Sequence, residues 1–120
     1  MVKESISLTK PIETGNIIEF IYGTKQKPGQ TGGWKNDPKP ALLVFYDDGV
    51  GYIEGINTNY LSDYYIRKVR MIRDIFPGIS GEELYNVIKR SASYALKKGY
   101  RKYLRPSLKN TMIWKLKIED

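Results

Sequence analysis

The sequence predicts an α+β fold, in which a small curved antiparallel sheet is followed by two basic helices and a closing C-terminal strand. Short runs rich in β-branched and aromatic residues, separated by Gly- and Pro-containing turns, occupy residues 1–60. Apolar residues at helical spacing follow in residues 61–111. An alternating segment over 112–118 returns to the strand pattern. The 120 residues fit a single domain, and no flexible linker separates its three parts.

Three strands are predicted in the first half, over residues 16–22, 41–46 and 50–56. Asp48-Gly49, before the third, is typical of a two-residue type I′ turn, which fixes the register of the hairpin. The predicted opposite pairs are Phe45 with Tyr52, Val44 with Ile53, Leu42 with Gly55, and Tyr46 with Gly51. Glycines opposite large side chains indicate a strongly bent sheet or a close backbone approach. A small bent sheet of this kind suits an SH3-like barrel.

Residues 23–39 form a polar, Gly- and Pro-rich loop that exceeds the usual connection length, which indicates a functional segment. Its stretch 28–35 lacks the GxxxxGK[ST] pattern, and no strand leads into a helix around it. A contact loop is therefore the better interpretation than a phosphate cradle, and Trp34 is the predicted interface anchor.

Two helices are predicted in the second half. Ser62 can cap a helix over residues 63–75, and Pro77-Gly78 ends it. Ser80 and Glu83 have capping-box spacing and predict a second helix over residues 81–98. Gly99 is the predicted left-handed stop of this helix.

The residues after Gly99 do not show a single type of secondary-structure pattern. Residues 100–108 are ambiguous, because Pro106 is suited to open a short helix. Residues 113–118 alternate apolar and basic side chains, which predicts a final strand.

The positive charge is concentrated in the second half. Residues 1–60 carry six basic and seven acidic residues, a net −1, whereas residues 61–120 carry fourteen basic and six acidic residues, a net +8. No acid occurs between Glu83 and Glu119. Such a stretch repels itself unless a polyanion or an acidic surface neutralises it.

The chain contains no cysteine and no histidine. Disulfides, thiolate metal sites and nucleophile–histidine pairs are therefore excluded, and an enzyme is disfavoured. Asp47-Asp48 lies at a predicted hairpin tip, so turn residues explain it better than a metal site. We expect no cofactor and no metal. No apolar run is long enough to span a membrane, and the first residues lack a secretory layout. Together with the lack of cysteine, this favours an intracellular origin and is compatible with a virion component.

The basic stretch around residues 100–105 is the strongest candidate for a binding site. Lysine and arginine can neutralise phosphates, and tyrosines can stack on bases. The predicted nucleic-acid-binding residues are Lys89, Arg90, Lys97, Lys98, Tyr100, Arg101, Lys102, Tyr103, Arg105 and Lys109. Two alternatives remain open: a solvated basic face whose tyrosines pack on the sheet, and a surface for an acidic protein partner. Arg67, Lys68, Arg70 and Arg73 form a second basic group, best interpreted as the polar face of a helix.

Residues 15–22, 37–44 and 55–61, together with 100–104, resemble small, largely uncharacterised proteins of large tailed bacteriophages. The resemblance implies an SH3-like sheet followed by a basic helical region, and it supplies no catalytic residues. It implies an accessory or virion protein, located in the host cytoplasm or in the virion. Within it, residues 55–61 are interpreted as a structural junction between sheet and helix.

Two functions are therefore predicted. The first is a non-enzymatic accessory protein that binds DNA or RNA through its basic second half, without strong sequence specificity. The second is a virion or assembly component that docks on other phage proteins, with the Trp34 loop as an anchor.

Overall fold

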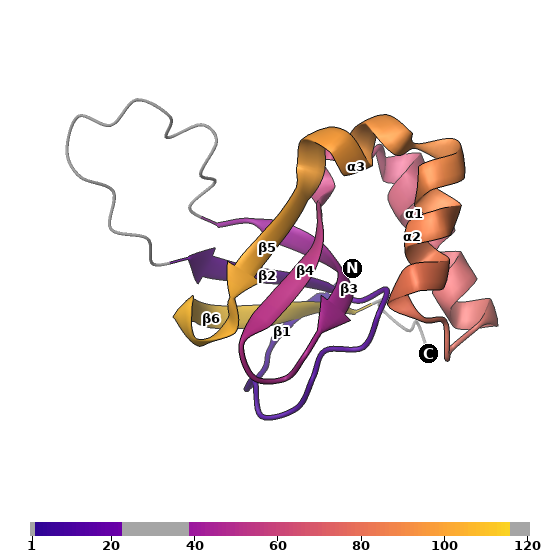
Figure 1. Cartoon of the computed structure of the whole chain (residues 1–120). Coiled ribbons are helices and arrows are strands. Elements are labelled where there is room, and N and C mark those ends of the chain that lie inside the picture. The colour runs from indigo at the N-terminus through magenta and orange to yellow at the C-terminus, as the bar shows by residue number, and fades with distance from the viewer. Residues whose placement is uncertain (1, 23–38, 116–120) are drawn as a thin grey trace, which may run out of the picture.

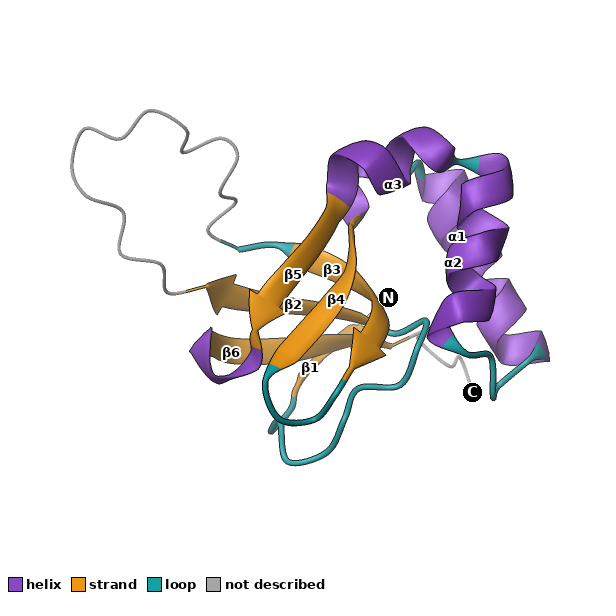
Figure 2. Ribbon diagram, viewed as in Figure 1, coloured by secondary structure: helices purple, strands orange, loops and turns teal. Residues whose placement is uncertain are grey.

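In the computed structural model of the chain, residues 2–22 and 39–115 are described, and they form a mixed α+β fold (Figures 1 and 2). The α+β class predicted from the sequence is confirmed. The elements in chain order are β1 (Val2–Ser5), β2 (Ile17–Tyr22), β3 (Ala41–Asp47), β4 (Tyr52–Asn57), the 3₁₀ turn η1 (Thr58–Tyr60), α1 (Asp63–Ile75), α2 (Gly81–Ser91), α3 (Ser93–Gly99), β5 (Tyr100–Leu104), the 3₁₀ turn η2 (Arg105–Ser107) and β6 (Leu108–Lys115).

All six strands belong to one antiparallel sheet with the order β1-β6-β2-β3-β4-β5. Within the described residues the sheet is open, and β1 and β5 are its edges. The predicted final strand exists, but it lies between β1 and β2 instead of closing a barrel. Its predicted residues 116–118 fall outside the described part of the chain.

Two apolar cores cover the two faces of the sheet. The helices pack on one face, where Phe45 and Ile56 meet Leu84 and Ile88 of α2. The helices lie together on this side in Figure 2. The opposite face carries Phe20 and its neighbours, covered in part by apolar side chains of the segment before β2. Because both faces are covered, β2 and β3 contain consecutive buried residues instead of a strict alternation.

The predicted register of the β3–β4 hairpin is wrong. Val44 pairs with Gly55, and the connection spans residues 48–51, because the Asp48 carboxylate accepts hydrogen bonds from the amides of Val50, Gly51 and Tyr52. Gly49 has a φ of +79°, which favours glycine. A register shift between Val44 and Tyr46 indicates a β-bulge.

Of the two explanations predicted for Gly55, a bent sheet or a close backbone approach, the structure shows the close approach. A Cβ atom on this residue would lie 1.9 Å from the Leu43 carbonyl oxygen. Only glycine therefore fits where β3 and β4 bend together.

The helix starts were predicted correctly. The Ser62 hydroxyl accepts from the Tyr65 amide at 3.1 Å, and α1 spans the predicted residues. The Ser80–Glu83 capping box is present, with both of its hydrogen bonds formed. These signals could be read from sequence because a capping interaction involves only residues three apart.

The single predicted helix over 81–98 is wrong, because the chain breaks at Ala92 into α2 and α3. Ala92 has φ −147° and ψ 49°, and it lies buried in the core under the helices. Gly99 is not a left-handed stop, since Gly15 and Gly49 are the positive-φ glycines among the described residues. Glycine is needed at this position because the Tyr60 ring lies close to the backbone: a Cβ on Gly99 would be 2.8 Å from that ring.

Pro106 does open a short helix, the turn η2, as the sequence indicated. The edge strand β1 was not predicted, because its four residues are all exposed and show no apolar alternation. Its pairing with β6 is accompanied by the ion pair Glu4–Lys115, at 2.8 Å.

Candidate functional site

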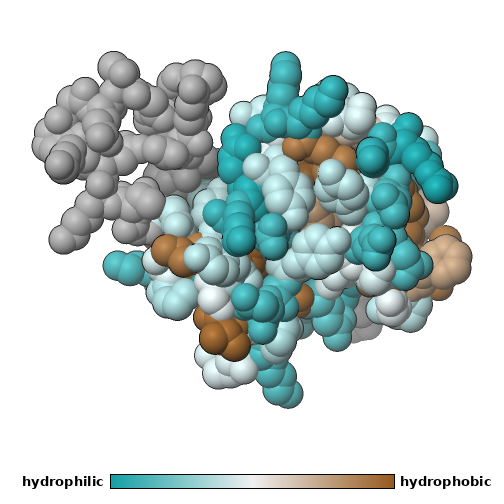
Figure 3. All heavy atoms as spheres, in the orientation of Figure 1, coloured by the Kyte–Doolittle hydropathy of each residue, from teal (hydrophilic) through white to brown (hydrophobic). Residues whose placement is uncertain are grey.

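The last turns of α2 and α3 and the following strand β5 carry six basic residues of the predicted binding set. Lys89 and Arg90 end α2, and Lys97 and Lys98 end α3. Arg101 and Lys102 follow on β5. Because α3 contacts both α2 and β5, these elements are continuous in space. We call these six side chains the basic surface; Figure 3 shows hydrophilic residues gathered over α3 and β5.

Lysines at the ends of helices have a local reason to be there. The C-terminal end of a helix carries a partial negative charge, which favours cations in its last turn. Both α2 and α3 place two basic residues in that turn. This placement stabilises the helices while leaving the long side chains in solvent.

No residue of the basic surface forms an ion pair with a carboxylate within residues 2–22 and 39–115. The ion pairs there join Lys3 with Glu19, Arg73 with Glu13, Arg105 with Asp47, and Lys115 with Glu4. Five of the six residues are exposed, and Arg101 is half-buried. The basic surface therefore carries cations that the described part of the chain does not neutralise.

The two residues on β5 have other contacts. The Arg101 guanidinium donates to the carbonyls of Lys98 and Tyr100, both at 2.9 Å, and lies 5.7 Å from the Tyr60 ring centroid. The Lys102 ammonium lies 4.2 Å from the ring centroid of Tyr52. These contacts hold the cations at the surface without cancelling their charge.

Tyr100 and Tyr103, predicted to stack on bases, pack instead on the sheet. The Tyr100 ring stacks on Phe45, and its hydroxyl donates to Glu54 at 3.2 Å. Burial, followed by the negative charge of Glu54, raises the pKa of Tyr100 above its ordinary value. Tyr103 packs edge-on against Phe20, 5.0 Å between centroids. For these two tyrosines, the alternative of tyrosines packed on the sheet agrees with the structure.

Arg105 also differs from the prediction, because it is buried and its guanidinium is engaged inside the molecule. Its Nε donates to Asp47 Oδ1 at 2.9 Å, and its two Nη groups donate to the carbonyls of Leu8 and Lys10, both at 2.8 Å. The Asp47 carboxylate also accepts from the amides of Ile12 and Gly49. A side chain with these partners is not available to a phosphate. Asp47 is accordingly a structural residue, in agreement with the turn interpretation.

The remaining predicted residues lie elsewhere. Lys109 is exposed on β6, where it pairs with Ile21, and does not belong to the basic surface. Trp34 lies outside the described residues.

The second basic group, on α1, does not act as one face. Arg67 and Lys68 are exposed, whereas Arg70 is buried and Arg73 approaches Glu13 at 3.7 Å. Arg70 Nη2 donates to the Trp114 carbonyl at 3.3 Å, and its Nε and Nη1 have no hydrogen-bond partner among the described residues. Burial, followed by the charge of Arg73, lowers the pKa of Arg70. Part of this group therefore belongs to the interior.

Sequence reasoning missed a set of exposed side chains beside the basic surface. Tyr46, Tyr52 and Leu104, on β3, β4 and β5, are 41%, 44% and 45% exposed. Tyr52 and Leu104 are direct cross-strand partners. The only sequence signal was two tyrosines flanking the hairpin, and the wrong register placed them opposite Phe45 and Gly51.

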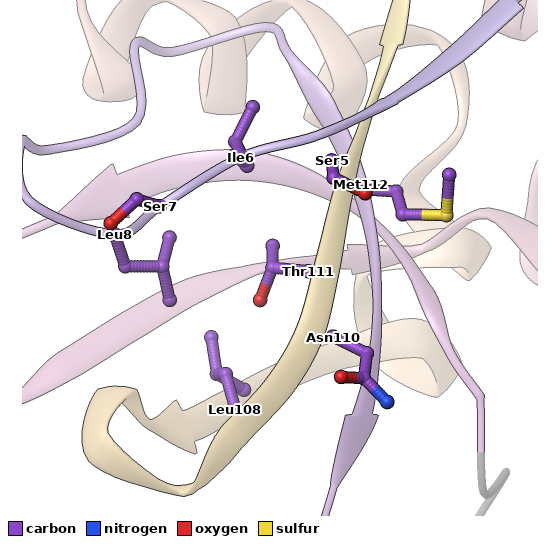
Figure 4. Close-up of a pocket in the computed structure, with 8 residues that line it drawn as sticks. All are labelled: Ser5, Ile6, Ser7, Leu8, Leu108, Asn110, Thr111 and Met112. Atoms are coloured by element: carbon purple, nitrogen blue, oxygen red, sulfur yellow. The ribbon is translucent and has the colours of Figure 1, made fainter.

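The surface of the described residues includes two hollows. One, of about 590 Å³, is lined by residues 5–8 and by Leu108, Asn110, Thr111 and Met112. Figure 4 shows Ile6, Leu8, Leu108 and Thr111 on one side of β6, with Asn110 and Met112 on the other. The residues that line this first hollow include no ionisable side chain. The other, of about 330 Å³, lies between η1, α1 and Trp114. Neither contains a residue of the basic surface.

The described residues contain no group of three or more acidic side chains arranged to hold a metal ion. None of the helices in this part of the chain has the length and apolar character needed to cross a bilayer. Comparison of the chain with known protein families, curated proteins and solved structures found no match.

Proposed function

We propose that the protein binds nucleic acid through the phosphate backbone, using the basic surface on α2, α3 and β5, without strong sequence specificity. The observation that carries this proposal is the set of six cations on contacting elements that lack a carboxylate partner in the described chain. Binding a polyanion would relieve their mutual repulsion and release counterions from the phosphates.

The composition of the surface favours backbone contact over base reading. Four of its six residues are lysines, which act on phosphates as mobile point charges. Of its two arginines, Arg101 has Nη1 engaged by two backbone carbonyls, which leaves it fewer donors for a base edge than a free guanidinium has. Such a surface binds the charged phosphates and distinguishes nucleotide sequences only weakly.

The test is fluorescence anisotropy with labelled oligonucleotides over a series of salt concentrations. The variant Lys97→Gln/Lys98→Gln/Lys102→Gln removes three charges of the basic surface. Each lost phosphate contact lowers the slope of log K against log salt by roughly 0.7–0.9, so we expect a slope smaller by about 2. The loss of affinity should be similar for unrelated sequences.

The matched control is Lys10→Gln/Lys68→Gln/Lys109→Gln, which removes three exposed lysines outside the basic surface. It should keep the wild-type slope. Equal losses in the two triple variants would show that net charge alone matters. No binding to any DNA or RNA at low salt would overturn the proposal and favour an acidic protein partner.

A further inference from the structure

The exposed end of the sheet beside the basic surface presents two tyrosine rings. Tyr46 is paired with Glu54, which is paired with Lys102, and the next row pairs Tyr52 with Leu104. We call Tyr46, Tyr52, Lys102 and Leu104 the tyrosine face. Beyond Glu54 along β4, the helices cover the sheet, and Ile56 is fully buried.

The Tyr46 ring is held in place although it is exposed. It lies against the first residue of α2, since a Cβ on Gly81 would be 2.4 Å from Tyr46 Cε1. The bulge between Val44 and Tyr46 redirects the strand at this point. A ring seated in this way loses little conformational freedom when a ligand packs on it.

Tyr52 adjoins the positive charge of the basic surface. The Lys102 ammonium lies 4.2 Å from the centroid of the Tyr52 ring, so a cation and an aromatic ring lie next to each other. One nucleotide needs both: a cation for its phosphate and an aromatic ring for its base. Lys102 is exposed, and lysine has a flexible four-carbon stem, so its ammonium can move from the ring to a phosphate and leave the ring to a base.

Acidic side chains lie at the Tyr46 end of the tyrosine face. Glu54 lies between Tyr46 and Lys102 in the sheet, and Glu82 lies near Tyr46, whose pKa is raised by burial and then by these two carboxylates. Phosphates are repelled from this end and attracted to Lys97, Lys98 and Lys102. A bound strand would therefore run its backbone along α3 and β5 and turn its bases toward the tyrosines.

We propose that the nucleic acid bound by the basic surface is single-stranded, with unpaired bases stacking on Tyr52 and Tyr46. This inference rests on the proposed function. Bases in a duplex are already stacked and cannot reach the rings, whereas bases of a single strand can. DNA and RNA single strands share this chemistry.

The experiment compares a single-stranded oligonucleotide with the duplex of the same sequence. Tyr46→Leu and Tyr52→Leu keep an apolar side chain but remove the ring. Each should weaken single-strand binding roughly tenfold and leave duplex binding unchanged. Tyr52→Phe keeps the ring and should bind like the wild type. Tyr64→Leu, on α1 where Tyr64 is 73% exposed, is the matched control and should change neither affinity.

A second readout reports stacking directly. An oligonucleotide containing 2-aminopurine should lose fluorescence on binding the wild type, and lose less on binding Tyr52→Leu. Circular dichroism of each variant checks that it is folded; if Tyr46→Leu unfolds, the Tyr52 pair of variants decides.

The outcomes separate this inference from the proposed function. Equal affinity for both forms of the oligonucleotide, with no effect of the tyrosine variants, overturns the single-strand inference but leaves backbone binding intact. Absence of binding to either form overturns both.

Discussion

Tyr100 has basic neighbours in the sequence, but its environment in the structure is largely apolar. It stands among basic residues in the sequence, yet its ring packs on Phe45 and Tyr85 and its hydroxyl donates to Glu54. Losing the phenolic proton would place a negative charge in a half-buried site beside a carboxylate. Burial is the larger cause of the raised pKa, and the Glu54 charge is the next.

This raised pKa predicts a loss of stability at alkaline pH. In the unfolded chain Tyr100 titrates near its ordinary value of 10.0, whereas the folded protein keeps the proton. The contribution to stability is therefore fully present below pH 10.0 and is lost as the pH rises above it. Denaturant unfolding at about pH 8 and about pH 11 should show a smaller loss for Tyr100→Phe than for the wild type. Equal losses in the two proteins would contradict the prediction.

The difference between Arg101 and Arg105 could not be predicted from local sequence. Both arginines belong to one basic run, and four positions separate them. Arg105 is distinguished by Asp47, which lies 58 residues away in the chain, and by the carbonyls of Leu8 and Lys10. Contacts between residues this far apart in the chain cannot be recognised from residue spacing or composition. All residues of the basic run were therefore predicted to be exposed.

At the level of elements, the Arg105–Asp47 pair joins three connections. It links the turn η2 to the end of β3 and to the segment before β2. The Asp47 side chain is fully buried, and that of Arg105 is 8% exposed. The pair therefore holds together three connections that are far apart in the sequence.

Arg105→Ala should destabilise the fold strongly, because it leaves the buried Asp47 carboxylate with only two backbone donors. Removing one partner of a buried ion pair costs about 3–5 kcal/mol. Urea unfolding followed by circular dichroism measures the change. Arg101→Ala, which removes a half-buried arginine of the same strand region, is the control and should cost about 1 kcal/mol or less. If both variants lose the same stability, Arg105 has no special structural role.

Elements defined by short-range signals were predicted well, and those defined by packing were not. The caps at Ser62 and Ser80 act over three residues, and both helices begin where predicted. The helix breaks at Ala92, which is buried in the core and has a non-helical backbone, although the apolar pattern runs through it without interruption. The hairpin register failed because the Asp48 side chain, rather than the Asp-Gly turn alone, organises the loop.

The molecule as a whole separates its paired and unpaired charges. The ion pairs of the described chain involve β1, β2, β3, β6, α1, η2 and the loop at Glu13. The basic surface on α2, α3 and β5 takes part in none of the ion pairs among the described residues. The charge asymmetry of the sequence pointed to the second half of the chain as the contact surface. In the structure Arg105 is buried in an ion pair, Tyr100 and Tyr103 pack on the sheet, and the tyrosine face was not predicted.

Self-repulsion within the basic surface should make the folded protein more stable as salt is added. Salt screens exposed charges, with a Debye length near 30 Å at about 0.01 M and near 10 Å at about 0.1 M. The exposed ion pairs contribute little, and the buried Arg105–Asp47 pair is screened least, so relief of repulsion should dominate. Scanning calorimetry should show Tm rising by a few degrees over this range.

The same two triple variants locate the source of the effect. Lys97→Gln/Lys98→Gln/Lys102→Gln should begin with a higher Tm at low salt and gain less on screening, because the repulsion has already been removed. Lys10→Gln/Lys68→Gln/Lys109→Gln should keep most of the wild-type gain, because its lysines lie apart from the cluster. A Tm that is constant or falls with salt would mean that the unpaired cations do not strain the free protein. Counterion release would then be the only electrostatic term favouring a polyanion.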